Sequence, residues 1–222
     1  MNQKSVTLHK QIIKTVTLNY LLHVPAHADS GQKLPLMLFL HGSGERGDDL
    51  SRVAVHGPPK LVEQDQDFPF IVVSPQCPEN TIWSQHYDAL NAVLDEIIGS
   101  YPVDTDRVYL TGLSMGGSAA WNFAALYPER FAALVPICGR GDWYIGDPQQ
   151  LCVLRDVPIW VFHGALDTVI PLVESAKLVQ AIQACGGQVR FTVYPEAGHD
   201  SWSQAYATPE LYSWMLKQSR RS

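Results

Sequence analysis

Three residues in the second half of the chain have the types and order needed for nucleophilic catalysis: Ser114, Asp167 and His199. A serine hydroxyl is a weak nucleophile until a histidine takes its proton, and the histidine needs a carboxylate to fix its tautomer and stabilise its charged form. Ser114 lies in Gly112-Leu113-Ser114-Met115-Gly116-Gly117, with a glycine two residues before and two residues after it. This G-x-S-x-G pattern predicts an exposed nucleophile on a sharp turn.

The residues around Ser114 predict a strand that turns directly into a helix. An apolar run at 107–112 precedes the serine and a helical pattern at 115–126 follows it. Such a turn brings the positions two residues on either side of the serine nearly into contact, so only glycine fits at 112 and 116, while Gly117 lets the helix pack close to the sheet. An ordinary capping serine in a glycine-rich turn is the alternative, and the flanking strand and helix favour the nucleophile.

The partners of the serine should follow it in the order acid and then histidine, each after a later strand. His199 follows the run at 188–194 in a loop beside Gly198, whereas His163 lies inside an apolar run, where a structural role is expected. Asp167 comes just after the run at 158–163. The competing acids lie at the wrong end of the sheet, in a helix or in other loops: Asp142, Asp147, Asp156, Glu174 and Glu196.

Attack on a carbonyl creates a negative oxygen, which needs about two preorganised N–H donors. The N–H of Met115, directly after the serine, is the first expected donor. The second should come from the glycine-rich segment Leu40-His41-Gly42-Ser43-Gly44-Glu45, with Ser43 as the predicted donor and Gly44 as the alternative. His41 is expected to brace this loop. The charged residues at 45–49 either shape substrate entry or are simply solvated.

Strands alternate with helices along the chain, which predicts the α/β class. Continuous apolar runs, typical of strands buried on both faces, occur at 34–40, 68–74, 107–112, 131–138, 157–164 and 188–195. Residues 5–9 and 15–24 alternate between apolar and polar and predict an antiparallel hairpin at one edge. Helices are expected at 87–98, 115–126, 171–185 and 208–218. We therefore expect one domain, 1–222, with about eight strands in a mostly parallel sheet and helices on both faces.

Five ordered motifs resemble those of the α/β-hydrolase superfamily: LFLHGSGERGDD at 38–49, VVSPQCP at 72–78, DRVYLTGLSMGGSAAW at 106–121, HGALDTVIP at 163–171 and GHDSW at 198–202. The chain is similar over nearly its whole length to small carboxylesterases and predicted peptidases related to prolyl oligopeptidase and dienelactone hydrolase. The resemblance implies ester hydrolysis through an acyl-enzyme on Ser114. A dienelactone hydrolase proper would use cysteine as its nucleophile, and the serine here argues against that lactone-specific activity.

The loops near the expected site suggest a modest, open cleft. About twenty residues connect the runs at 131–138 and 158–163, too few for a large helical cap. Trp83, Trp143 and Trp202 are predicted to line the cleft, together with Tyr144, and aromatic walls suit short acyl chains or small aromatic acyl groups. We expect a serine carboxylesterase. A small serine peptidase, an acyl thioesterase, an acyltransferase and a non-catalytic binding protein are the alternatives.

Composition limits the partners and the location. The 222 residues carry a net charge of −6, which disfavours nucleic acid and anionic membranes and favours a small-molecule ester as partner. No metal-ligand spacing or nucleotide motif is present, so no metal and no cofactor is expected. The N-terminus lacks a secretory pattern and no apolar run approaches about 20 residues, which predicts a cytoplasmic protein. The oligomeric state stays open.

Cys77, Cys138, Cys152 and Cys185 are expected to be buried thiols, although a bridge such as Cys138 to Cys152 stays open.

Overall fold

A seven-stranded sheet forms the centre of the computed structural model, which describes residues 3–11, 13–26, 28, 31–141 and 148–220. The strand order is β1-β3-β2-β4-β5-β6-β7, and only β1 runs antiparallel to its neighbour. The strands are β1 Tyr20–His23, β2 Leu34–Leu40, β3 Ile71–Pro75, β4 Val103–Leu113, β5 Ala133–Ile137, β6 Ile159–Gly164 and β7 Val189–Tyr194.

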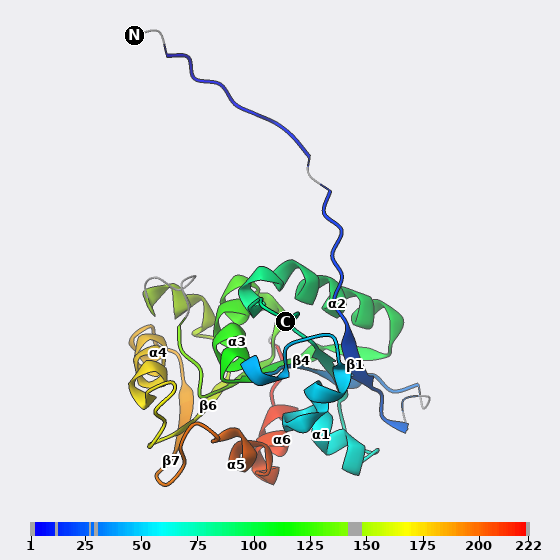
Figure 1. Ribbon diagram of the computed structural model, residues 1–222, viewed down its shortest axis with the longest axis vertical. Helices are drawn as coiled ribbons and strands as arrows, with labels where there is room; N and C mark the ends of the chain where they lie inside the picture. The colour runs from blue at the N-terminus through cyan, green and yellow to red at the C-terminus, as the bar shows by residue number, and fades with distance from the viewer. Residues whose placement is uncertain (1–2, 12, 27, 29–30, 142–147, 221–222) are drawn as a thin grey trace.

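Helices cover both faces of this sheet (Figure 1). They are α1 Gly57–Gln64, α2 Tyr87–Ser100, α3 Met115–Leu126, α4 Leu172–Ala184, α5 Trp202–Tyr206 and α6 Pro209–Leu216. Helices α2, α3 and α4 pack on the face that carries Leu36, Leu38 and Leu40 of β2, and α5 and α6 pack on the opposite face with Met37 and Phe39. Successive side chains of a strand point to opposite faces, so the continuous apolar run of β2 supplies two cores at once.

The predicted fold class is confirmed, with boundaries close to those expected. Helix α3 begins and ends where the sequence pattern placed it, and α2, α4 and α6 differ by a few residues. Helices α1 and α5 and the short 3-10 helices η2 Ser43–Glu45, η3 Leu50–Val55 and η4 Trp83–Gln85 were not anticipated, because they are too short to show a clear apolar period. The connection from β5 to β6 contains the 3-10 helix η6 Pro148–Leu154, and its described part holds no cap domain.

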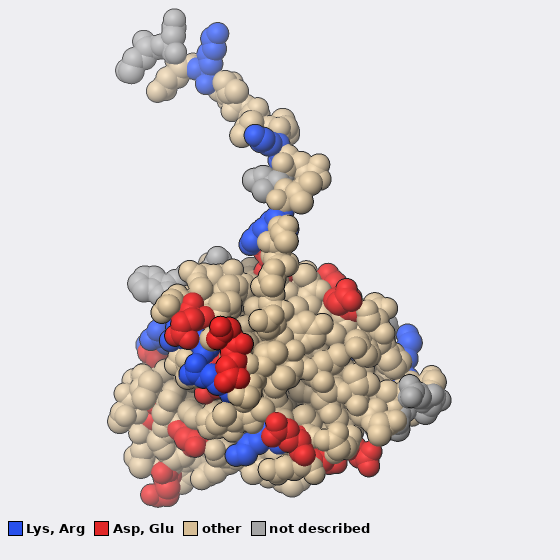
Figure 2. Space-filling model, turned by 45° about the vertical axis from the view of Figure 1, so that its right-hand side comes forward, with Lys and Arg blue, Asp and Glu red and all other residues tan. Residues whose placement is uncertain are grey.

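The predicted strand at 5–9 is wrong, and the described sheet therefore has seven strands rather than about eight. The described residues of 3–19, called the N-terminal arm below, contain no strand. Most of the arm extends away from the body of the molecule (Figures 1 and 2), and its last residues, among them Leu18 and Asn19, contact the body. A hairpin back onto residues 15–24 would need a tight turn between residues 9 and 14. That segment reads His-Lys-Gln-Ile-Ile-Lys and contains no glycine, proline, asparagine or aspartate.

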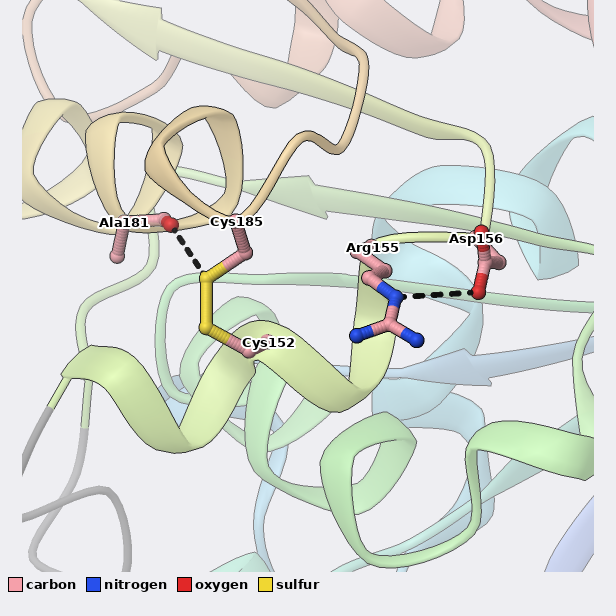
Figure 3. Close-up of a disulfide and its surroundings, with 5 residues drawn as sticks. All are labelled: Cys152, Arg155, Asp156, Ala181 and Cys185. Atoms are coloured by element: carbon pink, nitrogen blue, oxygen red, sulfur yellow. Dashed lines mark hydrogen bonds and ion pairs between the residues drawn. A yellow bond between two sulfur atoms is a disulfide. The ribbon is translucent and has the colours of Figure 1, made fainter.

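The expectation of four free thiols is also wrong for two of the cysteines. Cys152 of η6 and Cys185, which follows α4, form a disulfide with their Cα atoms 5.4 Å apart (Figure 3). Cys77 and Cys138 are free and buried. The bond ties the β5–β6 connection to the end of α4. Sequence spacing could not reveal it, because 33 residues separate the two cysteines. No helix in the described part of the chain is long and apolar enough to cross a membrane.

Candidate active site

Ser114 stands on the sharp turn between β4 and α3, in a backbone conformation that side chains rarely adopt. Its φ is 53° and its ψ is −114°, a strained combination that costs about 1–3 kcal/mol. A Cβ atom added to Gly112 would overlap the carbonyl of Gly116, and one added to Gly116 would overlap the carbonyl of Leu40. These overlaps give the glycines the steric role that the sequence predicted. The turn leaves the serine side chain partly exposed at the carboxyl end of the sheet.

Hydrogen bonds to both sides of Ser114 hold this strained turn. Its N–H donates to the carbonyl of Ile137 at the end of β5, at 3.0 Å. Its carbonyl accepts from the N–H of Ser118 at 2.9 Å and from the Ser118 hydroxyl at 3.2 Å. The Ser118 hydroxyl in turn accepts from the N–H of Arg140 at 3.0 Å. The conformation of the serine is therefore fixed by β5 and by the first turn of α3.

The structure brings Ser114, His199 and Asp167 into one hydrogen-bonded chain. Ser114 Oγ lies 2.8 Å from His199 Nε2, and His199 Nδ1 lies 2.7 Å from Asp167 Oδ2. The loops that carry the acid and the histidine are joined by backbone bonds, since the N–H of Leu166 donates to the carbonyl of Ala197 at 2.9 Å. The ends of β4, β6 and β7, which lie at the same edge of the sheet with β5 between β4 and β6, thus bring residues 114 and 167, 53 positions apart along the chain, to one histidine.

Asp167 is held as a buried carboxylate. Its side chain is fully buried, and Oδ1 accepts from the N–H groups of Val169 and Ile170, both at 2.9 Å. Burial alone would raise the pKa of Asp167, but the bond from His199 and the two N–H donors outweigh it, so the pKa lies below its usual value. An ionised Asp167 requires the proton of neutral His199 to sit on Nδ1. Nε2 is then an acceptor for the Ser114 hydroxyl.

A second histidine, His163, contacts the same carboxylate oxygen. It is buried, as expected for a structural histidine, and Nε2 lies 2.8 Å from the carbonyl of Ile170 and 3.2 Å from Asp167 Oδ2. Because a carbonyl only accepts, Nε2 carries the proton. The other nitrogen, Nδ1, lies 2.8 Å from the hydroxyl of Ser175. Burial lowers the pKa of His163 despite these partners. The spacing of four residues between His163 and Asp167 was the only sequence signal for this contact.

The loop after β2 lies against the serine turn. A Cβ atom added to Gly42 would lie 3.6 Å from Ser114 Cβ and 2.8 Å from Leu113 Cδ1. His41 is fully buried, with Nε2 accepting from the N–H of Cys77 at 2.9 Å and Nδ1 donating to the carbonyl of Gly42 at 2.6 Å. Burial lowers the pKa of His41 to about 4. His41 is thus a neutral brace with a defined tautomer, as the sequence suggested.

Side-chain donors fix four successive carbonyl groups of this loop. His41 bonds the carbonyl of Gly42, Arg46 that of Ser43 at 3.0 Å, Arg52 that of Gly44 at 2.6 Å and Gln76 that of Glu45 at 2.9 Å. In a trans peptide the N–H points opposite to the preceding carbonyl. The bond from His41 to Gly42 therefore turns the N–H of Ser43 away from the His41 ring. The N–H of Met115 is the first of α3 and has no partner within that helix.

Of the three tryptophans predicted to line the cleft, one is buried, one lies beside His199 and one lies outside the described residues. Trp83 is 1% exposed, donates from Nε1 to the carbonyl of His41 at 3.0 Å and packs on the His41 ring, so it supports the loop and cannot touch substrate. Trp202 is partly exposed, and its ring centre lies 5.3 Å from that of His199 in an edge arrangement. It remains the candidate wall. Trp143 and Tyr144 lie outside the described residues.

A buried thiol lies behind the histidine. Ligand atoms of Cys138, Asp167 and His199 lie within 4.8 Å of one another, and these are the described residues best placed to hold a metal ion. Burial raises the pKa of Cys138 to about 12, which keeps the thiol protonated and a poor ligand. The nitrogens of His199 are already engaged by the serine and the acid. The geometry therefore suits proton transfer between Ser114 and His199 better than metal binding.

Comparison with known families gives one match over most of the chain. Residues 53–208 match the family model described as Phospholipase/Carboxylesterase. A solved structure described as a thermostable esterase is 34% identical, with a TM-score of 0.82 over 92% of this chain and 60% of its own. A second solved structure, described as a ferulic acid esterase, is 21% identical and has a TM-score of 0.67 over 88% of this chain and 90% of its own; at that identity it shows the fold alone.

Curated relatives match over shorter stretches. A protein of Escherichia coli O157:H7 with the provisional name carboxymethylenebutenolidase is 33% identical over 101 residues, which are 43% of this chain and 37% of that protein. The poly(3-hydroxyoctanoate) depolymerase of Pseudomonas fluorescens is 30% identical over 133 residues, 50% of this chain and 47% of its own length. The chain thus spans less than half the length of these two relatives.

Proposed function

Because the chain belongs to the phospholipase/carboxylesterase family, we propose that it is a serine carboxylesterase that works through an acyl-enzyme. The expected α/β-hydrolase fold is confirmed by the sheet and by its structural neighbours, and the family comprises hydrolases of ester bonds. The observation that carries the proposal is the continuous chain Ser114 Oγ to His199 Nε2 at 2.8 Å and His199 Nδ1 to Asp167 Oδ2 at 2.7 Å.

The proposed reaction has two steps. Ser114 Oγ attacks the ester carbonyl while its proton moves to His199 Nε2, and the imidazolium then protonates the departing alcohol. In the second step His199 takes a proton from water, which attacks the acyl-enzyme; the bond to Ser114 Oγ then breaks, the imidazolium returns its proton to Oγ, and the acid leaves. Asp167, held ionised by its N–H donors, keeps His199 in the required tautomer and stabilises its charged form. The N–H groups of Met115 and Ser43 are the proposed donors to the oxyanion.

We propose short-chain or small aromatic carboxylic esters as substrates. The described part of the β5–β6 connection holds only η6, so a deep capped pocket for long acyl chains is not supported. The partly exposed ring of Trp202 beside His199 gives one apolar wall to the site. An aromatic wall binds a flat or short acyl group through apolar contact, which needs no charged partner.

A panel of p-nitrophenyl esters of rising acyl length tests the proposal, with Ser114→Ala and the exposed control Ser100→Ala. The wild type and Ser100→Ala should cleave the short esters, and Ser114→Ala should lose about 10⁴ to 10⁶ in turnover. Activity that persists in Ser114→Ala would remove this serine from the mechanism. Inactivity of the wild type on every oxygen ester, with cleavage of an acyl thioester or a small peptide anilide, would move the assignment to those alternative substrates.

The disulfide between Cys152 and Cys185 indicates the kind of cellular compartment in which the protein works. Bonds such as Cys152–Cys185 persist in oxidising compartments and are rare in the cytosol. We therefore favour an oxidising compartment over the cytoplasmic location expected from the N-terminal sequence. Thiol titration of the denatured protein, prepared from its native host with alkylation at lysis, should find two free cysteines rather than four. Four free thiols would restore the cytoplasmic assignment.

A further inference from the structure

Strand β1 has one edge that no strand covers. On its inner side β1 pairs with β3, with Leu21 opposite Ser74 and His23 opposite Val72, and the N–H of Gln76 donates to the carbonyl of Asn19 at 2.8 Å. In an antiparallel pair every second residue turns its N–H and carbonyl toward the partner. The groups of Tyr20 and Leu22 therefore point outward, and within the described chain no strand pairs with them.

The N-terminal arm that leads into β1 has the sequence of a strand. Val6, Leu8, Val16 and Leu18 occupy even positions, the same parity as Tyr20 and Leu22. Leu18, Tyr20 and Leu22 already pack against the core on the α2 face, whereas Val6 and Leu8 are 85% and 83% exposed. If the alternation continues, Val6 and Leu8 share a sheet face with Leu18, Tyr20 and Leu22, which are partly buried there. Exposed apolar residues in a strand pattern mark an element that lacks its partner.

We infer that the arm pairs with the outer edge of β1 in a second copy of this chain. The absence of turn residues between 9 and 14 disfavours pairing with the edge of its own β1. The eleven residues 3–13, which precede the contact of Lys14 with Asp88, reach about 36 Å in extended form, which is enough to cross to a neighbouring molecule. A reciprocal exchange of two arms is closed by a two-fold axis, so it ends at a dimer in which both β1 edges are covered.

Charge supports a second copy as the occupant. Residues 1–19 contain Lys4, Lys10 and Lys14 and no acidic residue, so the remaining chain holds 13 basic and 22 acidic side chains. Figure 2 shows basic side chains along the arm and both acidic and basic side chains on the visible face of the body. Within one chain, Lys14 Nζ already lies 2.7 Å from Asp88 of α2, which shows that an arm lysine can pair with an acidic group of the body. A basic arm on the acidic body of a partner is electrostatically favourable.

The test combines mass, amide exchange and a matched pair of variants of the full chain. Sedimentation at rising protein concentration should show a monomer–dimer equilibrium, with amide protection of residues 3–18 that rises as dimer forms. Val6→Asp/Leu8→Asp should shift the dimer toward monomer by at least about tenfold in the dissociation constant. Ser5→Asp/Thr7→Asp adds the same charge on the opposite face of the arm and should shift it much less. Hydrolysis of p-nitrophenyl acetate, measured in all forms, reports that each is folded.

Each other outcome overturns the inference. A monomer with unprotected arm amides means that the arm has no partner in this chain. A monomer with protected arm amides means that the arm folds onto its own molecule. A dimer that survives Val6→Asp/Leu8→Asp, or that is disrupted equally by both variants, associates through a different surface or through charge alone.

Discussion

The turn that carries Ser114 and the loop after β2 lie against each other at the candidate site, yet they are held in shape by different means. The turn is fixed by steric exclusion, since glycines at 112 and 116 leave no room for any other side chain. The loop is fixed by side-chain donors, three of them within eight positions of the carbonyl they bond and one, Gln76, more than thirty positions along the chain. The first constraint is visible in sequence, whereas the second depends on how the folded loop directs these side chains.

Substitution of Gly116 is the most direct way to break the turn. The new Cβ of Gly116→Ala would overlap the carbonyls of Leu40 and His41, so both the turn and the loop must move apart. We expect esterase turnover to fall by about 10⁴-fold, combining about 10² for a displaced nucleophile with about 10² for a displaced N–H donor. Gly99→Ala is the matched control, because nothing lies within 4 Å of its new Cβ in α2.

The control variant Gly99→Ala also has an expected effect, an increase in stability. Alanine is the better helix former, so Gly99→Ala should raise the free energy of unfolding by about 0.5–1 kcal/mol without change in turnover. Urea unfolding and hydrolysis of p-nitrophenyl acetate measure both quantities. A Gly116→Ala protein that folds with wild-type turnover would show that steric exclusion does not set the geometry of the turn.

His41 tests the loop in the same way. His41→Phe keeps a ring against Trp83 but removes the bond to the carbonyl of Gly42 and leaves the N–H of Cys77 without its acceptor. If His41 orients the N–H of Ser43 toward the oxyanion, turnover should fall by about 10² to 10³ while KM changes little. A variant that loses stability but keeps turnover would reduce His41 to a packing residue and move the donor to Gly44.

The contrast also explains which parts of the site the sequence could predict. Ser114, Asp167 and His199 follow a fixed order after successive strands, and the glycines around the serine are local, so these residues could be placed from their neighbours alone. The burial of Trp83 could not be predicted from the sequence, because it depends on a hydrogen bond to the carbonyl of His41, 42 residues away. The same limit applies to the pairing of Cys152 with Cys185.

Acid should destabilise the folded protein through His41, which braces the loop after β2. Its pKa in the folded protein is about 4, below the value of 6.5 expected when unfolded, so the unfolded state binds more protons between these values. Stability should therefore fall as the pH drops from about 6.5 to about 4, by about 3 kcal/mol from this residue. The lowered pKa of His163 acts in the same direction. The urea midpoint of His41→Phe should depend less on pH than that of the wild type, and equal slopes would exclude His41 as the cause.

The smallest expected effect on turnover comes from Arg52, whose hydrogen bond to the loop after β2 is exposed to solvent. Arg52 donates to the carbonyl of Gly44 at 2.6 Å, but this bond is exposed and water can replace it. Arg52→Met should lower turnover by about threefold, corresponding to about 0.7 kcal/mol, in the range of a single replaceable hydrogen bond. Lys177→Met removes an equally exposed cation paired with Glu174 and should leave turnover unchanged. If turnover fell as far in Arg52→Met as in His41→Phe, the hydrogen bonds to the loop carbonyls would act as one cooperative unit, and the loss of any one of them would disrupt the whole loop.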